Sequence, residues 1–123
     1  MIENEITGEI LKCAFTVHSA LGSGLLESAY KVCLAYELRQ NGLFVEQEKP
    51  MPLKYKEINL DIGYRLDLLV EGKVIVELKV VDAFTSIHIA QVLTYLRLSD
   101  CKIGLLLNFN ETSLKRGIKR VML

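Results

Sequence analysis

The stretch from Gly63 to Asp82, GYRLDLLVEGKVIVELKVVD, decides the fold because its apolar pattern predicts two neighbouring β-strands. Apolar residues alternate with others in residues 66–70 and again in residues 74–80. The polar Glu71-Gly72 pair between the two runs predicts a tight turn. The stretch is therefore expected to form an antiparallel hairpin.

The apolar pattern also selects the register of this hairpin. A two-residue loop would set the apolar face of one strand beside the polar face of the other. A three-residue loop, Glu71 to Lys73, pairs Val70 with Val74 instead. It gathers six apolar side chains on one face: Leu66, Leu68, Val70, Val74, Val76 and Leu78. Because a one-residue slip inverts every side chain, burial of this face predicts the three-residue loop or an equivalent bulge.

The same register places two acids opposite each other on the second face. Asp67 falls across from Glu77, with Lys79 two residues further along and Arg65 across from that lysine. Facing carboxylates repel by up to about 1 kcal/mol unless solvent or a cation separates them. Two hard oxygen ligands suit Mg²⁺ or Mn²⁺, and a neighbouring lysine can hold and polarise an attacking water. The alternative interpretation is an ordinary solvated strand face.

The rest of the chain predicts helices packed on a mixed sheet. Helical spacing covers residues 3–21 and about 25–40, and a third helix runs from about 85 to 98. Strand patterns cover residues 51–55, 58–62, 66–70, 74–80, 103–107 and, at a weaker edge, 117–123. The 103–107 strand is apolar on both faces, as in a fully buried strand. The order α-α-β-β-β-β-α-β-β predicts a mixed α/β fold and a single domain over residues 1–123.

Composition limits the class of protein. The 123 residues carry 15 Lys+Arg and 15 Asp+Glu, and half are hydrophobic, which excludes intrinsic disorder and a protein that coats nucleic acid by bulk charge. No apolar run approaches the roughly 18 residues of a membrane span, and the first residues are acidic, unlike a signal peptide. We therefore expect a cytoplasmic protein. The basic residues Lys115, Arg116, Lys119 and Arg120 form either a solvated end or a phosphate contact.

The helical segments carry polar residues whose spacing groups them. His88, Gln91 and Tyr95 share one face of the third predicted helix, which is either a substrate wall or a hydrogen-bonded seam. Off that stripe, four residues are expected to pack on the sheet: Ile87, Ala90, Leu93 and Leu98. For His88 a structural role is the simpler interpretation. In the second helix, Glu27 and Tyr30 share a face at i, i+3.

These residues resemble a known family. Asp67 on one strand and Glu77-Leu78-Lys79 on the next resemble the PD-(D/E)XK nuclease superfamily, which has a restriction-endonuclease-like fold; Leu66 stands where the motif name has proline. The segment Gln91–Tyr95, QVLTY, is similar to the Q-x-x-x-Y motif of its exonuclease-like branch. The segment Gly24–Tyr30, GLLESAY, resembles the signature of the GxxExxY family of small bacterial proteins, assigned to the same superfamily.

The resemblance implies a metal-dependent nuclease that hydrolyses phosphodiester bonds, with DNA as the expected substrate. It implies Asp67 and Glu77 as ligands of Mg²⁺ or Mn²⁺, with the backbone carbonyl of Leu78 as a further ligand. Lys79 would position or activate water, and Glu27 would join the metal shell or bind a second ion.

The helix residues complete the implied site. Gln91 joins the catalytic set, and Tyr95 and Tyr30 are expected to contact substrate. A domain this small would need a second copy, as a homodimer, to cut both strands together. The competing hypothesis is a non-catalytic binding or assembly module that retains the nuclease fold.

Overall fold

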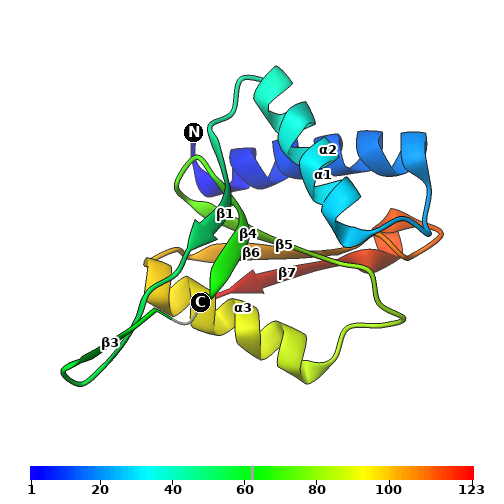
Figure 1. Cartoon of the computed structure of the whole chain (residues 1–123). Helices are drawn as coiled ribbons and strands as arrows, with labels where there is room; N and C mark the ends of the chain where they lie inside the picture. The colour runs from blue at the N-terminus through cyan, green and yellow to red at the C-terminus, as the bar shows by residue number, and fades with distance from the viewer. Residues whose placement is uncertain (62) are drawn as a thin grey trace.

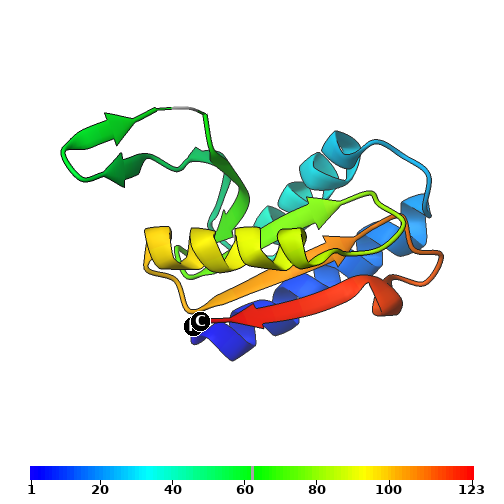
Figure 2. The same ribbon diagram turned by 90° about the horizontal axis from the view of Figure 1, so that it is seen from below.

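The computed structural model describes residues 1–61 and 63–123, which form a five-stranded mixed sheet with helices on both faces (Figures 1 and 2). The helices are α1 (Glu3–Leu21), α2 (Glu27–Gln40), α3 (Ser86–Ser99) and the short 3₁₀ helix η1 (Leu114–Gly117). The sheet contains β1 (Val45–Pro50), β4 (Arg65–Val70), β5 (Val74–Lys79), β6 (Ile103–Asn108) and β7 (Ile118–Met122). The predicted fold class, a restriction-endonuclease-like mixed sheet with flanking helices, is confirmed.

The strands lie in the order β1-β4-β5-β6-β7, and only β5 and β6 are parallel. A parallel pair needs a crossover connection, which α3 provides on one face of the sheet. Strand β6 is buried along its whole length, as predicted for a strand apolar on both faces. None of the helices in the described part of the chain is long and apolar enough to cross a membrane.

The β4–β5 hairpin has the predicted register. Val70 pairs with Val74 and Leu68 with Val76, so the loop is the three-residue Glu71–Lys73. Glu71 and Gly72 both adopt positive φ, and the Lys73 N–H donates to the Val70 carbonyl at 3.0 Å. The register prediction is therefore confirmed at the turn end of the hairpin.

The two faces of the sheet carry separate apolar cores. One lies under α1 and α2, shown above the sheet in Figure 1, and the other lies against α3 on the opposite face. Leu68 packs in the first core, but Leu66 packs in the second, which corrects the prediction that both share a face. The cause is an irregularity between them, because β4 pairs with β1 on both sides of Asp67 but not at Asp67 itself. Its neighbour on β1, Glu48, has a φ of 50°.

Helix α3 presents a different face to the sheet from the one predicted. Its buried residues are Val92, Tyr95 and Leu96, whereas Ile87 is 72% exposed. Of the other residues expected to pack there, Leu93 is half-buried, and Ala90 and Leu98 are exposed. The helix approaches β6 closely at Gly104, where an added Cβ would lie 2.7 Å from Val92 Cγ1. The Val92–Leu96 stripe fits over this glycine, so the helix turns its Tyr95 side inward.

The region before β4 also differs from the prediction. The structure has five strands before α3 rather than four, because Val45–Pro50 forms the edge strand β1. Its sequence, VEQEKP, carries three charges and ends in proline, features that edge strands use against further pairing. The short strands β2 (Leu53–Tyr55) and β3 (Ile58–Leu60) form a separate hairpin that projects from the sheet (Figure 2). The predicted strand residue Ile62 lies outside the described residues.

Candidate active site

Asp67 and Glu77 meet where the regular pairing of β4 and β5 ends. The Asp67 N–H donates to Glu77 Oε2 at 2.7 Å, and the Leu78 N–H donates to Asp67 Oδ2 at 2.9 Å. Each carboxylate therefore bonds to the backbone of the opposite strand, beyond the last paired residues of the ladder. The structure brings together the two acids that the register placed opposite each other.

Burial makes the charge of Glu77 costly. Glu77 is only 4% exposed. Its pKa is raised to about 8, first by burial and then by the charge of Asp67. The hydrogen bond from the Asp67 backbone and the charge of Lys79 act in the opposite direction. Among the residues that the structure describes, no Lys or Arg nitrogen lies within 4.0 Å of its carboxylate. A buried carboxyl in this state favours either a proton or an added cation.

Glu27 faces the same pair from the first residue of α2. Burial raises its pKa and the charge of Asp67 raises it further, while Lys79 and Lys31 lower it. Within residues 1–61 and 63–123, however, no three His, Cys, Asp or Glu side chains come close enough to hold a metal ion. The structure thus shows a hydrogen-bonded pair, Asp67 and Glu77, and the charge of Asp67 raises the pKa of Glu27.

Tyr30 holds the loop that presents Glu27. Its hydroxyl donates to the Gly22 carbonyl at 2.6 Å and accepts from the Leu25 N–H at 3.1 Å. Its ring is fully buried and stacks on Phe109 with the ring centroids 4.7 Å apart. The substrate contact predicted for Tyr30 does not fit this placement, because both functions of its hydroxyl serve the α1–α2 connection.

Lys79 is the last residue of β5, and hydrogen bonds from the end of β6 hold the backbone around it. The Phe109 N–H donates to the Lys79 carbonyl at 3.0 Å. The buried Asn108 amide donates to the Val81 carbonyl at 2.8 Å and accepts from the Val81 N–H at 3.2 Å. The charge of Lys79 lowers the pKa of both Glu27 and Glu77, so this lysine acts electrostatically on both acids.

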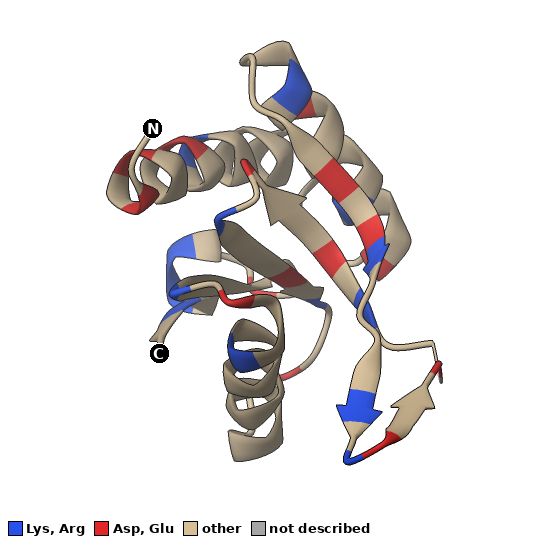
Figure 3. Ribbon diagram, turned by 90° about the vertical axis from the view of Figure 1, so that its left-hand side faces the viewer, with Lys and Arg blue, Asp and Glu red and all other residues tan. Residues whose placement is uncertain are grey.

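Two charged residues that sequence reasoning missed complete the cluster. Lys31 Nζ forms an ion pair with Glu48 of β1 and lies 3.5 Å from Asp67 Oδ1. The Lys31 side chain is only 14% exposed. The i, i+4 spacing from Glu27 to Lys31 was a usable signal, since such residues share a helix face. No sequence pattern marked Glu48. Figure 3 shows acidic segments of β1, β4 and β5 side by side.

Gln91 and Tyr95 approach the acids from α3. Tyr95 is buried, and its pKa is raised first by burial and then by the charges of Glu77 and Asp67. With four other residues, the two line a pocket of about 270 Å³: Leu53, Tyr64, Thr94 and Leu98. His88 has the structural role, because its Nδ1 accepts the Thr85 N–H at 3.1 Å and caps α3.

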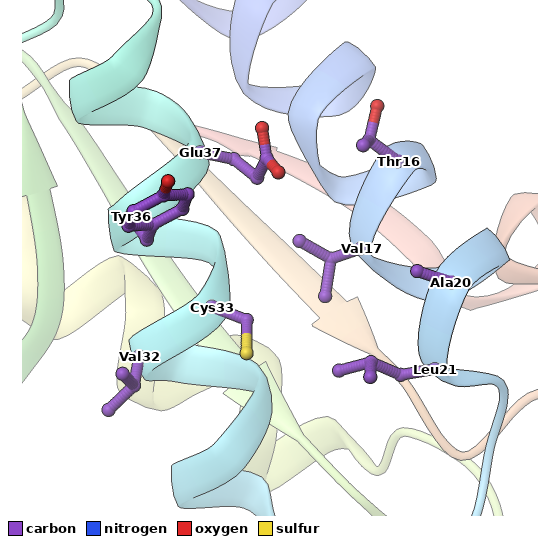
Figure 4. A pocket seen from close by; sticks show the side chains of 8 residues that line it. All are labelled: Thr16, Val17, Ala20, Leu21, Val32, Cys33, Tyr36 and Glu37. Carbon is purple, nitrogen blue, oxygen red and sulfur yellow. The ribbon is translucent and has the colours of Figure 1, made fainter.

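Two other features lie apart from the acids. The basic residues 115–120 lie on η1 and β7, at the sheet edge opposite β1, and Arg120 donates to Asn4 Oδ1 at 2.6 Å. A larger pocket of about 390 Å³ lies between α1 and α2 and is mainly apolar (Figure 4). None of the predicted site residues lines it.

Comparison with known proteins agrees with this arrangement. A family model described as the PD-(D/E)XK nuclease superfamily matches residues 4–121. No curated protein and no solved structure matches the chain. Nucleases of this superfamily act on nucleic acid and generally depend on a divalent metal. The match spans almost the entire chain and includes both strands that carry Asp67 and Glu77, so the chain belongs to the PD-(D/E)XK nuclease superfamily.

Proposed function

We propose that this protein hydrolyses phosphodiester bonds of nucleic acid, with DNA as substrate and Mg²⁺ or Mn²⁺ as cofactor. The observation that carries the proposal is the Asp67–Glu77 pair, which is held by hydrogen bonds to opposite backbones and in which Glu77 has no ion-pair partner among the described residues. We also assign the chain to the GxxExxY group on the segment Gly24–Tyr30. Its tyrosine holds the loop before the motif glutamate, which gives that spacing a physical reason.

The donor set fits a hard divalent cation. Asp67 and Glu77 each use one oxygen on a backbone N–H, which leaves Asp67 Oδ1 and Glu77 Oε1 for a metal ion. The Leu78 carbonyl and the Glu27 carboxylate are further oxygen donors of the kind that Mg²⁺ and Mn²⁺ prefer. A cation bound there would supply positive charge to the phosphoryl group as negative charge develops on its oxygens.

The other residues divide the remaining work. Lys79, whose carbonyl is held by the Phe109 N–H and whose charge lowers the pKa of Glu77, would orient the attacking water and offset charge. Lys31 balances the charges of Asp67 and Glu48, and a cation bound at Asp67 would leave its ammonium group paired with Glu48 and able to contact a phosphate. Gln91 and Tyr95 would hold the nucleic acid on the α3 side.

A cleavage assay tests the proposal. Purified protein is incubated with plasmid and with linear DNA in Mg²⁺ or Mn²⁺, beside the variants Asp67→Ala and Lys79→Ala. Glu57→Gln is the matched control, since this exposed acid lies in the loop between β2 and β3. We expect cleavage by the wild type and the control, and loss of cleavage in both site variants. Cleavage that persists unchanged in both would exclude the proposed site.

One observation favours a second candidate, a non-catalytic nuclease-fold binding or assembly module. Lys31 lies against Asp67, where a lysine can replace the metal ion permanently. Calorimetric titration with Mn²⁺ separates the two functions. No heat of binding to the wild type, together with normal folding of Asp67→Ala, would support the module. The homodimer and the cytoplasmic location stay predictions.

A further inference from the structure

We propose that the pocket between α3 and the β2–β3 arm binds one unpaired nucleobase of the substrate, so that the protein prefers single strands or unpaired ends. This inference rests on the proposed function and assigns its substrate class. The six lining residues come from three segments: Leu53 of β2, Tyr64 before β4, and Gln91, Thr94, Tyr95 and Leu98 of α3.

The pocket is built around a tyrosine with a fixed backbone. The Met51 N–H donates to the Tyr64 carbonyl at 2.7 Å, which ties the base of the projecting arm together. The Tyr64 residue is 45% exposed, so its ring remains accessible to a ligand. Tyr64 and the buried Tyr95 both line the pocket, and Tyr64 raises the pKa of Tyr95. The pocket therefore has one accessible and one buried aromatic side chain.

The chemistry of the lining suits a nucleobase. A base offers two flat π faces and a polar edge, and proteins bind it by stacking and by amide or hydroxyl hydrogen bonds. Tyr64 and the two leucines provide the flat apolar surface, and Gln91 provides an amide. Thr94 Oγ1 accepts from Arg97 Nη2 at 3.2 Å, which leaves its hydroxyl proton free to donate and holds a cation at the rim.

Size and position restrict the ligand further. The volume of about 270 Å³ lies at the lower limit of ligand pockets, roughly 300–1,000 Å³, and suits one base rather than a stretch of duplex. Tyr64, which lines the pocket, directly precedes β4 with its Asp67, and the charges of Glu77 and Asp67 raise the pKa of Tyr95, so the pocket lies on the side of the acid pair. The proposal places the phosphate of a nucleotide bound in this pocket on the side of those acids. A base inside a duplex cannot enter without leaving the stack.

The test compares the affinity for two DNA forms by fluorescence anisotropy. The probes are a short fluorescein-labelled single strand and a blunt-ended duplex of the same sequence, measured in calcium buffer, since Ca²⁺ also binds carboxylates. Tyr64→Ala removes the ring and Tyr64→Phe keeps it. Leu98→Trp fills the pocket at an exposed position, and Tyr55→Ala is the matched control, an exposed tyrosine of β2 outside the pocket.

We expect Tyr64→Ala and Leu98→Trp to weaken single-strand binding at least about fivefold, a typical cost of losing one stacked base, with duplex affinity unchanged. Tyr64→Phe and Tyr55→Ala should keep wild-type affinity for both probes. Equal effects on both probes, or no effect of Tyr64→Ala, would overturn the inference.

A cleavage assay in Mn²⁺ on the same variants separates the two proposals. If the wild type cuts DNA and Tyr64→Ala has the same strand preference, the proposed nuclease function stands and the proposed base pocket is excluded. If the wild type does not cut DNA but Tyr64→Ala selectively loses single-strand binding, the proposed nuclease function is excluded and the proposed base pocket stands.

Discussion

The two ends of the β4–β5 hairpin differ in what holds the strands together. At the turn end, Val70 pairs with Val74 in a regular ladder, and their fully buried side chains fill the core under α1 and α2. At the other end, the carboxylates of Asp67 and Glu77 take the backbone N–H groups that a regular ladder would pair. Apolar burial stabilises the first end, whereas the second holds two like charges together.

This difference shows how a small protein can hold a repulsive cluster in place. The regular end fixes the register of the hairpin. A fixed register places Asp67 opposite Glu77 even though their negative charges repel. The pKa of Glu77 is raised first by burial and then by the charge of Asp67, so it records the cost of holding this carboxylate there. Stability and proposed chemistry therefore reside in the same two strands but a few residues apart, and mutations should separate them.

The largest expected effect is on activity at the acid end. Asp67→Asn keeps an oxygen that accepts the Leu78 N–H but removes the negative charge. We expect kcat/KM for DNA cleavage to fall by about 10³-fold, roughly 4 kcal/mol, while the free energy of unfolding changes by less than about 1 kcal/mol. Cleavage kinetics and urea unfolding measure the two quantities. A large loss of stability with little loss of activity would contradict the division between the two ends.

The next effect is on stability at the turn end. Leu68 is fully buried in the core under α1 and α2, so Leu68→Ala should lower the free energy of unfolding by about 3 kcal/mol. Urea denaturation measures this loss. Val32→Ala, at an exposed position of α2, is the control and should cost less than about 0.5 kcal/mol. A loss below about 1 kcal/mol for Leu68→Ala would show that this end does not carry the stability.

The same contrast explains what the sequence predicted and what it did not. The register was predictable because six apolar side chains depend on it together. Leu66 was misplaced because strict alternation assumes a regular strand, and the ladder is interrupted at Asp67. Strand β1 was missed since its charged sequence has no apolar alternation, and only its pairing with β4 makes it a strand.

The site was predictable where its residues share an element or a hairpin. Asp67 opposite Glu77 followed from the hairpin register, and Lys79 followed from its spacing along β5. Lys31 and Glu48 come from a helix and an edge strand, and their meeting depends on how α2 packs on the sheet. Tyr30 was predicted to contact substrate, and its structural role was missed because spacing alone does not show which side of α2 is buried.

A smaller effect should appear as pH dependence at the acid end. The pKa of Glu77 rises from 4.5 to about 8 on folding, so its ionisation opposes folding in the metal-free protein. Its contribution is favourable below pH 4.5 and is lost as the pH rises through about 8. Glu77→Gln cannot ionise, so in EDTA the variant should exceed the wild type in unfolding free energy by about 2 kcal/mol at pH 6 and by little at pH 4.5.

Urea unfolding in EDTA at several pH values measures that difference. Added Mg²⁺ should stabilise the wild type at pH 8 and leave Glu77→Gln nearly unchanged, because a cation offsets only an ionised pair. Parallel pH curves for the two proteins would show that folding does not raise the pKa of Glu77.

The smallest effect concerns the cation that the chain itself supplies. Lys31 Nζ lies 3.5 Å from Asp67 Oδ1, at the oxygen that a metal ion would use. Lys31→Met keeps the length of the side chain and removes its charge, so a competing cation disappears. We expect the Kd for Mn²⁺, measured by calorimetry, to fall about fivefold, close to 1 kcal/mol, whereas Lys31→Arg should stay near the wild type. A weaker affinity in Lys31→Met would mean instead that the Lys31–Glu48 ion pair shapes the site for the metal, since losing that pair would then matter more than removing the competitor.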